Sequence, residues 1–246
     1  MKKSILWLLP ILFIALLSFS GCEDEMETGS EDNPVDEQEN GIDPDYDTEK
    51  VLVRVNGDEI TQGDFDTYIL QLKHQYEEQQ GLDLDDPQHG DIAEELKIRA
   101  MNDLIEQRAL VQRSEELDLT VPSSFVDQQI QGIIQQQGSE EEFESFLENR
   151  ELTREDLEVL IEEDQLITAV YEQELDLNNI SYDEEELDAL YDRFVKQRED
   201  MGREPESFEE VEDELAQSLI QRRRQEVQRN YVENLIDNSD IEYFFN

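Results

Sequence analysis

The only cysteine of the chain, Cys22, is the residue with the most recognisable chemical setting. Lys2 and Lys3 precede an apolar run from Ile5 to Phe19, and small residues follow directly before the cysteine. A basic segment, a short apolar run and small residues in this order are typical of a secretory signal. We therefore predict that residues 1–21 are a signal peptide with a lipoprotein cleavage site before Cys22. A single cysteine also excludes an internal disulfide.

Three aspartates further along the chain raise the question of calcium. Asp43, Asp45 and Asp47 have the one-three-five spacing of the ligands in a calcium-binding loop. Thr48 stands at the position of the turn glycine, however, and Arg54 stands where such a loop has its bidentate glutamate. We therefore interpret this segment as a solvated charge run and predict no metal site.

The two histidines, His74 and His89, are the residues best suited to acid–base catalysis near neutral pH. One lies beside an apolar stripe and the other in a predicted loop, and neither has a cysteine or a second histidine close in sequence. The chain also has no glycine-rich motif of the kind that holds a nucleotide phosphate. We therefore predict surface or packing roles for both histidines, no catalytic residue and no cofactor.

Acidic residues dominate the composition. The 246 residues include 66 Asp and Glu against 19 Lys and Arg, which gives a formal charge of −47 at pH 7. This balance argues against nucleic acid as a partner, because binding its backbone depends on Lys and Arg, and anionic lipid would repel the chain. The acids are spread along the sequence, as expected of a halophilic protein, in which concentrated salt screens self-repulsion.

Residues 51–76 predict a hairpin that leads into a helix. Valines alternate from Val51 to Val55 at the strand period, and Asn56-Gly57 supplies the two positive-φ residues of a type I′ turn. A short return strand follows. Thr61 and Asp64 then form a capping pair for a helix with one apolar stripe.

The rest of the chain predicts a series of amphipathic helices and a final strand. Further capping pairs are Ser139 with Glu142, Thr153 with Asp156, Ser181 with Glu184, and Ser207 with Glu210. Ile241, Tyr243 and Phe245 alternate near the C-terminus, and the hairpin is the expected partner of this strand. The predicted fold class is therefore mostly α, with a small β-sheet formed by the N-terminal hairpin and the C-terminal strand.

Four segments resemble the corresponding parts of SurA- and PrsA-type exported chaperones and foldases. They are VLVRVNGDEITQGDFDTYI, MNDLIEQRALVQRSEELDLTVPSSFVDQQI, GSEEEFESFLENRELTREDLEVLIEEDQL and SFEEVEDELAQSLIQRRRQEVQRNYVENLIDNSDIEYF. The resemblance implies a multi-helix SurA-like chaperone domain over residues 51–246, whose last helix packs back among the first. It also implies that unfolded or partly folded exported proteins are the partners, held by apolar contact between amphipathic helices.

The segment LLSFSGC resembles the bacterial lipobox, with Phe19 where leucine is usual. This resemblance implies lipidation of Cys22 and cleavage before it, although an ordinary secretory signal or an uncleaved anchor stays open. Residues 22–50 are acidic with hardly any large apolar residue, which predicts a disordered tether. The expected location is therefore the extracytoplasmic face of a cell membrane, with the lipid as anchor.

One domain that is common in this family has no matching segment in the chain. The family commonly carries a parvulin-type prolyl isomerase after the helix matched by YDEEELDALYDRF, but only the polar break QREDMGREPE, without histidine, follows here. We therefore predict a holdase or foldase that is not an enzyme. The alternatives are a non-chaperone surface lipoprotein, acting as an adhesin or assembly factor, and, less favoured, a prolyl isomerase. The client and the oligomeric state stay open.

Candidate residues for a client groove are the aromatic side chains of the apolar stripes, such as Tyr68, Tyr76, Phe143 and Phe146. Core positions are the favoured interpretation for large apolar side chains, so no client-binding residue is assigned. Arg222, Arg223, Arg224 and Arg229 form a basic cluster that we expect to pair with neighbouring acids.

Cys22→Ala is expected to release the protein from the membrane, because the mature chain is too acidic to adhere to an anionic bilayer by itself. The measurement is membrane fractionation after a high-salt wash, with mass spectrometry to show whether the signal was cut. A variant that loses its signal and still stays in the membrane fraction would contradict lipid anchoring.

Overall fold

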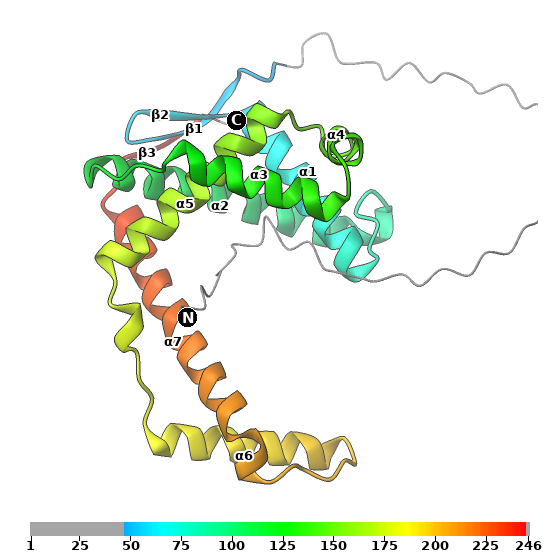
Figure 1. The fold of residues 1–246 in the computed structure, drawn as a ribbon, viewed down its shortest axis with the longest axis vertical. Helices are drawn as coiled ribbons and strands as arrows, with labels where there is room; N and C mark the ends of the chain where they lie inside the picture. The colour runs from blue at the N-terminus through cyan, green and yellow to red at the C-terminus, as the bar shows by residue number, and fades with distance from the viewer. Residues whose placement is uncertain (1–46, 245–246) are drawn as a thin grey trace, which may run out of the picture.

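The computed structural model describes residues 47–244, which form a body and an arm (Figure 1). The body contains the three strands, α1 to α5 and the end of α7, while the arm contains α6 and the beginning of α7. The described helices and strands are β1 (Val51–Val55), β2 (Asp58–Thr61), α1 (Gln62–Gln80), η2 (Pro87–His89), α2 (Gly90–Glu116), α3 (Ser123–Gln137), α4 (Glu140–Glu148), α5 (Arg154–Glu174), η3 (Leu177–Asn179), α6 (Glu184–Asp200), α7 (Phe208–Asp237) and β3 (Ile241–Tyr243).

The hairpin forms as predicted. Asn56 and Gly57 have φ values of 50° and 103°, the left-handed conformation that a tight turn between twisted strands requires. Thr61 caps α1, since its Oγ1 accepts from the backbone N–H of Asp64 at 3.2 Å and the Asp64 carboxylate accepts from the N–H of Thr61 at 2.8 Å. The turn at residues 47–50 contacts the same helix end, where Gly63 donates to the carbonyl of Thr48.

The C-terminal strand joins the hairpin, which confirms the predicted sheet. β3 pairs antiparallel with β1, placing Tyr243 opposite Val53 and Ile241 opposite Val55, so the strand order is β2-β1-β3. Ile241 packs against the core beneath the sheet, whereas the Tyr243 side chain is 57% exposed. Phe245 lies outside the described residues.

Helix α2 is the centre of the body. It packs against α1, α5, α7 and both strands of the hairpin. Its buried side chains are Leu96, Ala100, Ile105, Ala109, Leu110 and Ser114. The small residues among them let neighbouring elements approach closely, so the sheet and three helices share this one support.

The helices α3, α4 and α5 form a second layer with a core of its own. Its buried side chains include Phe143, which is fully buried, together with Ile133 and Ile161. Thr153 and Asp156 form the predicted capping box of α5, and Ser139 caps α4 by accepting from the N–H of Glu142.

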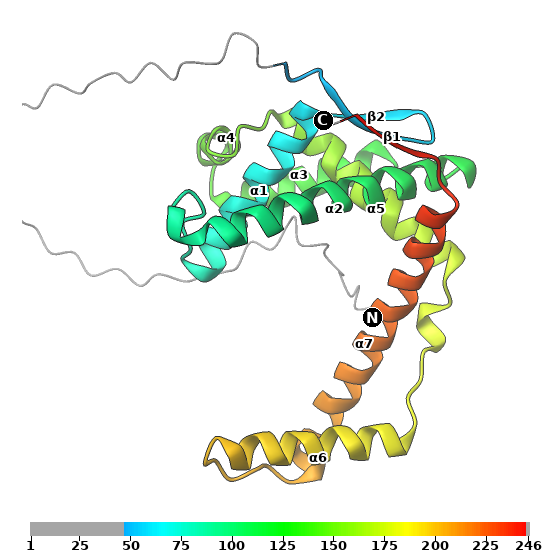
Figure 2. The same cartoon turned by 180° about the vertical axis from the view of Figure 1, so that it is seen from behind.

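The arm departs from the body along α7, a helix of 30 residues and therefore about 45 Å long. The views of Figures 1 and 2 show α6 crossing the far end of α7 and turning back below the body, so the molecule is hook-shaped. The first half of α7 packs on α6 through Val211, Leu215 and Leu219, and its last turns return to α2 and α5 through Val232. The last helix therefore packs back among the first ones, as expected.

Two predictions for the arm were wrong. The capping box of α6 is Asp183 with Glu186, not Ser181 with Glu184, because the same spacing recurs two residues later. The helix also continues to Asp200, so the predicted polar break shrinks to a loop from Met201 to the cap of α7.

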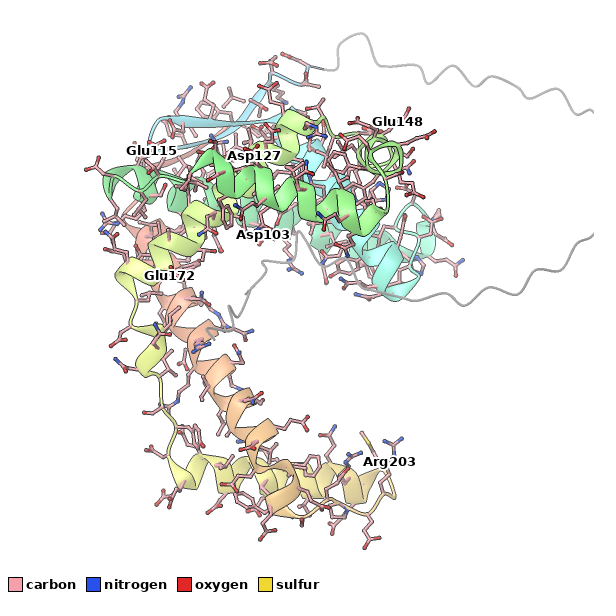
Figure 3. The ribbon with its side chains drawn as sticks, viewed as in Figure 1. Asp103, Glu115, Asp127, Glu148, Glu172 and Arg203 are labelled. Atoms are coloured by element: carbon pink, nitrogen blue, oxygen red, sulfur yellow. The ribbon has the colours of Figure 1, made fainter. Side chains whose placement is uncertain are left out.

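Charged side chains cover the surfaces of the body and of the arm. Figure 3 labels Glu115, Asp127, Glu148 and Glu172 in different regions of the body and Arg203 at the end of the arm. The negative charge is therefore distributed over the surface, not collected on one face.

Removal of the residues after Asn238 is expected to lower the free energy of unfolding by about 2–4 kcal/mol, because it deletes the β3 hydrogen bonds and the packing of Ile241. Hydrogen exchange should become faster in α1 as well as in α7, since Phe65 and Ile241 pack on the same core cluster. Unchanged exchange between Phe65 and Tyr76 would contradict a shared sheet.

Candidate functional site

The structure separates the residues that the sequence suggested for chemistry. Cys22, Asp43 and Asp45 lie outside the described residues, and the part of the chain that the structure describes contains no group of acids, histidines or cysteines that could hold a metal ion. His74 lies on α1, with its Nδ1 3.9 Å from Glu77 Oε2. His89 ends η2, where its Nδ1 is 2.5 Å from the Asp83 carbonyl oxygen. Each histidine therefore has a local partner in the body.

Within residues 47–244, no helix combines the length and apolar character needed to cross a bilayer.

The aromatic candidates for a client groove divide between core and surface. Tyr68 and Phe143 are buried in separate clusters of the body, which agrees with their interpretation as core residues. Tyr76 and Phe146 are partly buried and pack at the edges of the same two clusters. None of the four belongs to the arm.

The arm has its own aromatic surface. Tyr191 and Phe208 meet edge to face with ring centroids 5.3 Å apart, and Phe194 stacks beside Tyr191 at 6.3 Å. These rings are partly buried, because only two helices supply the core beneath them. Met201, at the end of α6, is 58% exposed. The arm therefore presents apolar side chains that no third helix among the described residues covers.

Arginines of α7 hold the segment between α5 and α6. Arg223 donates to both carboxylate oxygens of Glu186 at 2.6 Å and to the carbonyl of Ser181 at 2.9 Å. Arg224 donates to the carbonyl of Leu177 at 3.2 Å. Arg223 thus pairs with an acid as predicted, and together the two arginines fix this connection against α7.

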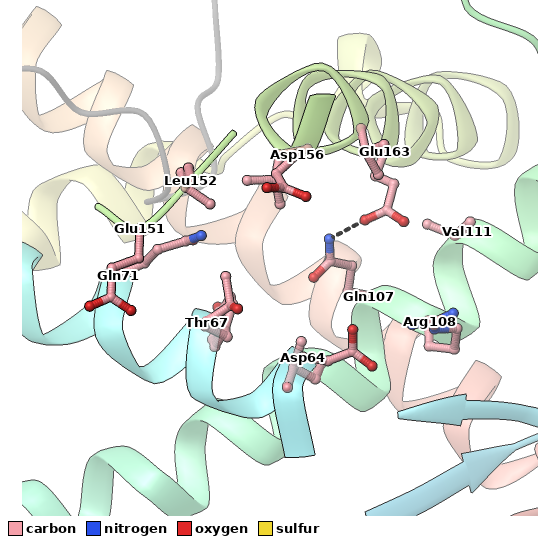
Figure 4. A pocket seen from close by; sticks show the side chains of 15 residues that line it. Asp64, Thr67, Gln71, Gln107, Arg108, Val111, Glu151, Leu152, Asp156 and Glu163 are labelled. Carbon is pink, nitrogen blue, oxygen red and sulfur yellow. Dashed lines mark hydrogen bonds between the residues drawn. The ribbon is translucent and has the colours of Figure 1, made fainter. Parts of the chain in front are cut away.

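A cavity of about 280 Å³ lies between α1, α2 and α5 (Figure 4). The first turns of α1 and α5, with the capping-box residues Asp64 and Asp156, border it from two sides, and α2 contributes Leu104, Gln107 and Arg108. Apolar side chains of α2 and α5 complete its wall. The cavity is lined by both apolar and polar side chains.

Two of the polar side chains that line the cavity are Gln107 on α2 and Gln71 on α1. Gln107 Nε2 donates to Glu163 Oε2 at 2.8 Å across the space between α2 and α5. Gln71 Oε1 is buried and has no hydrogen-bond partner among the described residues. A buried acceptor without a donor costs free energy unless a water molecule donates to it.

Acids on α2 and α5 are partly desolvated. Burial raises the pKa of Glu163, while Arg108 and the hydrogen bond from Gln107 oppose this shift. Burial also raises the pKa of Asp164 and of Asp103, against the opposing charge of Arg99 in the latter case. The sequence shows that Glu163 and Gln107 are polar residues within amphipathic helices. Nothing in the neighbouring sequence indicates that the two side chains face each other.

The chain matches a known protein family. A family model described as the SurA-like N-terminal domain matches residues 1–171, more than half of the chain. The match ends three residues before the end of α5, so α6 and α7 lie beyond it. No curated protein matches the chain.

The protein is expected to be more stable at pH 5 than at pH 8. The raised pKa values of Asp103, Glu163 and Asp164 mean that the folded state binds protons more readily than the unfolded chain, so stability rises as the pH falls toward about 4. Glu186 and Glu210 have lowered pKa values and act in the opposite direction, but both are solvated.

Thermal unfolding followed by circular dichroism at constant salt measures this dependence. Glu163→Gln should flatten it, whereas Glu162→Gln on the exposed side of α5 serves as the control. A melting temperature that falls steadily between pH 8 and pH 5 would show that the desolvated acids do not govern stability.

Proposed function

We propose that this chain, which belongs to the family of SurA-like N-terminal domains, is a membrane-anchored extracytoplasmic chaperone that holds unfolded exported proteins. The family is of the chaperone type, and the match to it is the observation that carries the proposal. A hook-shaped molecule with a separate arm agrees with this function, because an extended client can then contact two surfaces at once.

Client binding would depend on apolar contact. The aromatic surface of the arm, with Tyr191, Phe194 and the exposed Met201, supplies side chains that can bury against an unfolded chain. Single apolar contacts of this kind are weak, so the client can leave without an energy source such as nucleotide hydrolysis. Concentrated kosmotropic salt would strengthen this binding, because it increases the free energy gained by burying apolar surface.

Prolyl isomerisation is not part of the proposed function. The loop from Met201 to Ser207, where relatives commonly carry a parvulin module, contains seven residues and no histidine. Both histidines of the chain lie in the body, on α1 and in η2. We propose accordingly that the protein holds clients and is not an enzyme.

Membrane attachment would come from Cys22 alone. A lipidated Cys22, followed by an acidic tether that reaches the turn at residues 47–50, would keep the body close to the extracytoplasmic surface of the membrane.

Aggregation of an unfolded exported protein, measured by light scattering in molar salt, tests the proposal. The full chain at a few-fold molar excess is expected to suppress aggregation, and a proline-containing tetrapeptide should isomerise no faster than in buffer. Met201→Ser should weaken suppression, whereas Ile98→Ser, which removes an even more exposed apolar side chain from the body, should not. Absence of suppression would favour an adhesin or assembly factor, and rapid isomerisation would indicate a prolyl isomerase.

A further inference from the structure

We propose that the acidic tether of this chain, residues 22–46, docks on a face of α7 that carries Arg222 and Arg229, on the inner side of the hook. Carboxylates of the tether make the contact by accepting hydrogen bonds from the two guanidinium groups. The inference concerns two parts of one chain, so it holds whether or not the protein binds clients.

The middle of α7 is basic, although the chain as a whole is strongly acidic. Its segment IQRRRQEVQRN contains four arginines and a single acid, Glu226. Arg223 and Arg224 donate to the segment between α5 and α6. Arg222 and Arg229 are exposed, and neither makes a hydrogen bond or an ion pair within residues 47–244. These two arginines are therefore available to an acid from outside that range.

Arg222 and Arg229 lie on one face of α7. Seven residues are almost two turns of a helix, so the two positions are about 10 Å apart along its axis. Two residues correspond to a rotation of about 200°, so Arg222 is opposite Arg224, which donates to the Leu177 carbonyl. Figures 1 and 2 show the segment that contains Leu177 on one side of α7, while the body and α6 extend toward the other side. The two arginines are therefore on the inner side of the hook.

The tether has a composition that complements this face. Residues 22–46 contain eleven Asp and Glu and no Lys or Arg. Carboxylates form charge-assisted and often bidentate hydrogen bonds with arginine. An extended chain rises by about 10 Å over three residues, which is the separation in sequence of Asp36 and Glu39. One short segment of the tether can therefore reach both arginines.

The end of the tether is held within reach of α7. Backbone hydrogen bonds of 2.8 Å fix the turn at residues 47–50 to the start of α1. From there β1 leads to Asn56, which binds Asp240 just after α7. This path is about 20 Å along β1, and Arg229 lies about 12 Å before the end of α7, whereas the 25 residues of the tether can span about 80 Å. Covalent attachment also raises the effective concentration of the tether at this face.

The contact is a salt-dependent cover for the inner side of the hook. Both arginines are exposed, so dissolved ions screen them from the tether. The screening length falls from about 10 Å at 0.1 M salt to about 3 Å at 1 M salt. The tether therefore covers this side in dilute salt and leaves it accessible in concentrated salt.

Zero-length cross-linking tests the docking. Arg229→Lys keeps the charge and supplies an amine that a carbodiimide can couple to a carboxylate, while Arg203→Lys supplies the same amine in the exposed loop at the end of the arm. Both full-chain variants are treated at the lowest salt at which circular dichroism shows a folded protein, and again at 1 M salt. Mass spectrometry should find about fivefold more coupling of residues 22–46 to position 229 than to position 203, and molar salt should reduce this excess.

Proteolysis measures the same contact without a cross-linker. In dilute salt, a glutamate-specific protease should cleave the tether about threefold faster when Arg222→Gln and Arg229→Gln are combined, whereas Arg203→Gln should leave the rate unchanged. Equal coupling at positions 229 and 203, or an unchanged cleavage rate in the double variant, would overturn the inference. Cross-linked products of twice the chain mass would assign the arginine face to a second copy, which would overturn it as well. Neither assay contains a client, so their failure leaves the proposed function untouched.

Discussion

The attachment of the chain's end to its first hairpin is the contact on which the remaining architecture depends. The backbone N–H of Asn56 donates to the Asp240 carbonyl at 2.8 Å, and the Asn56 side chain accepts from the N–H of Asp240 at 2.7 Å. The same side chain donates to Gln112 of α2, which in turn donates to the carbonyl of Val55. One turn residue thus joins the sheet, the central helix and the end of α7. Because these hydrogen bonds form beside the apolar contacts of Ile241, the end of α7 is fixed and the arm has a defined direction.

The arm illustrates how an acidic protein positions a distant surface with few cations. Its small core holds α6 on α7, but only α7 and the segment after α5 connect it to the body. Exposed ion pairs contribute little free energy, so the pair between Arg223 and Glu186 matters mainly for the direction in which it holds the chain. The donation of Arg224 to the Leu177 carbonyl acts in the same way, and neither contact requires a large interaction energy to be useful.

Three acids of α2 and α5 are partly buried, unlike the exposed ion pairs of the arm. Asp103, Glu163 and Asp164 are partly desolvated, although burying a negative charge costs free energy in a chain whose formal charge is −47. Leucine at position 163 would give a simpler contact between the two helices. Of the three acids, Glu163 alone lines the cavity, where it accepts a hydrogen bond from Gln107.

Local signals of the sequence determined the elements, because the groups that interact are a few residues apart. The turn at Asn56-Gly57 and the capping pair Thr61 with Asp64 could be predicted from adjacent residues alone. The alternation after Asp240 predicted a strand, and the hairpin was its expected partner. The start of α6 was misplaced since two capping pairs with equal spacing compete there, and the structure selects the pair whose glutamate also binds Arg223, 37 residues away. The direction of the arm and the cavity were decided by tertiary structure alone. Gln71, Gln107 and Glu163 belong to three helices, and no pattern along the chain records which of their polar atoms meet and which are left without a partner.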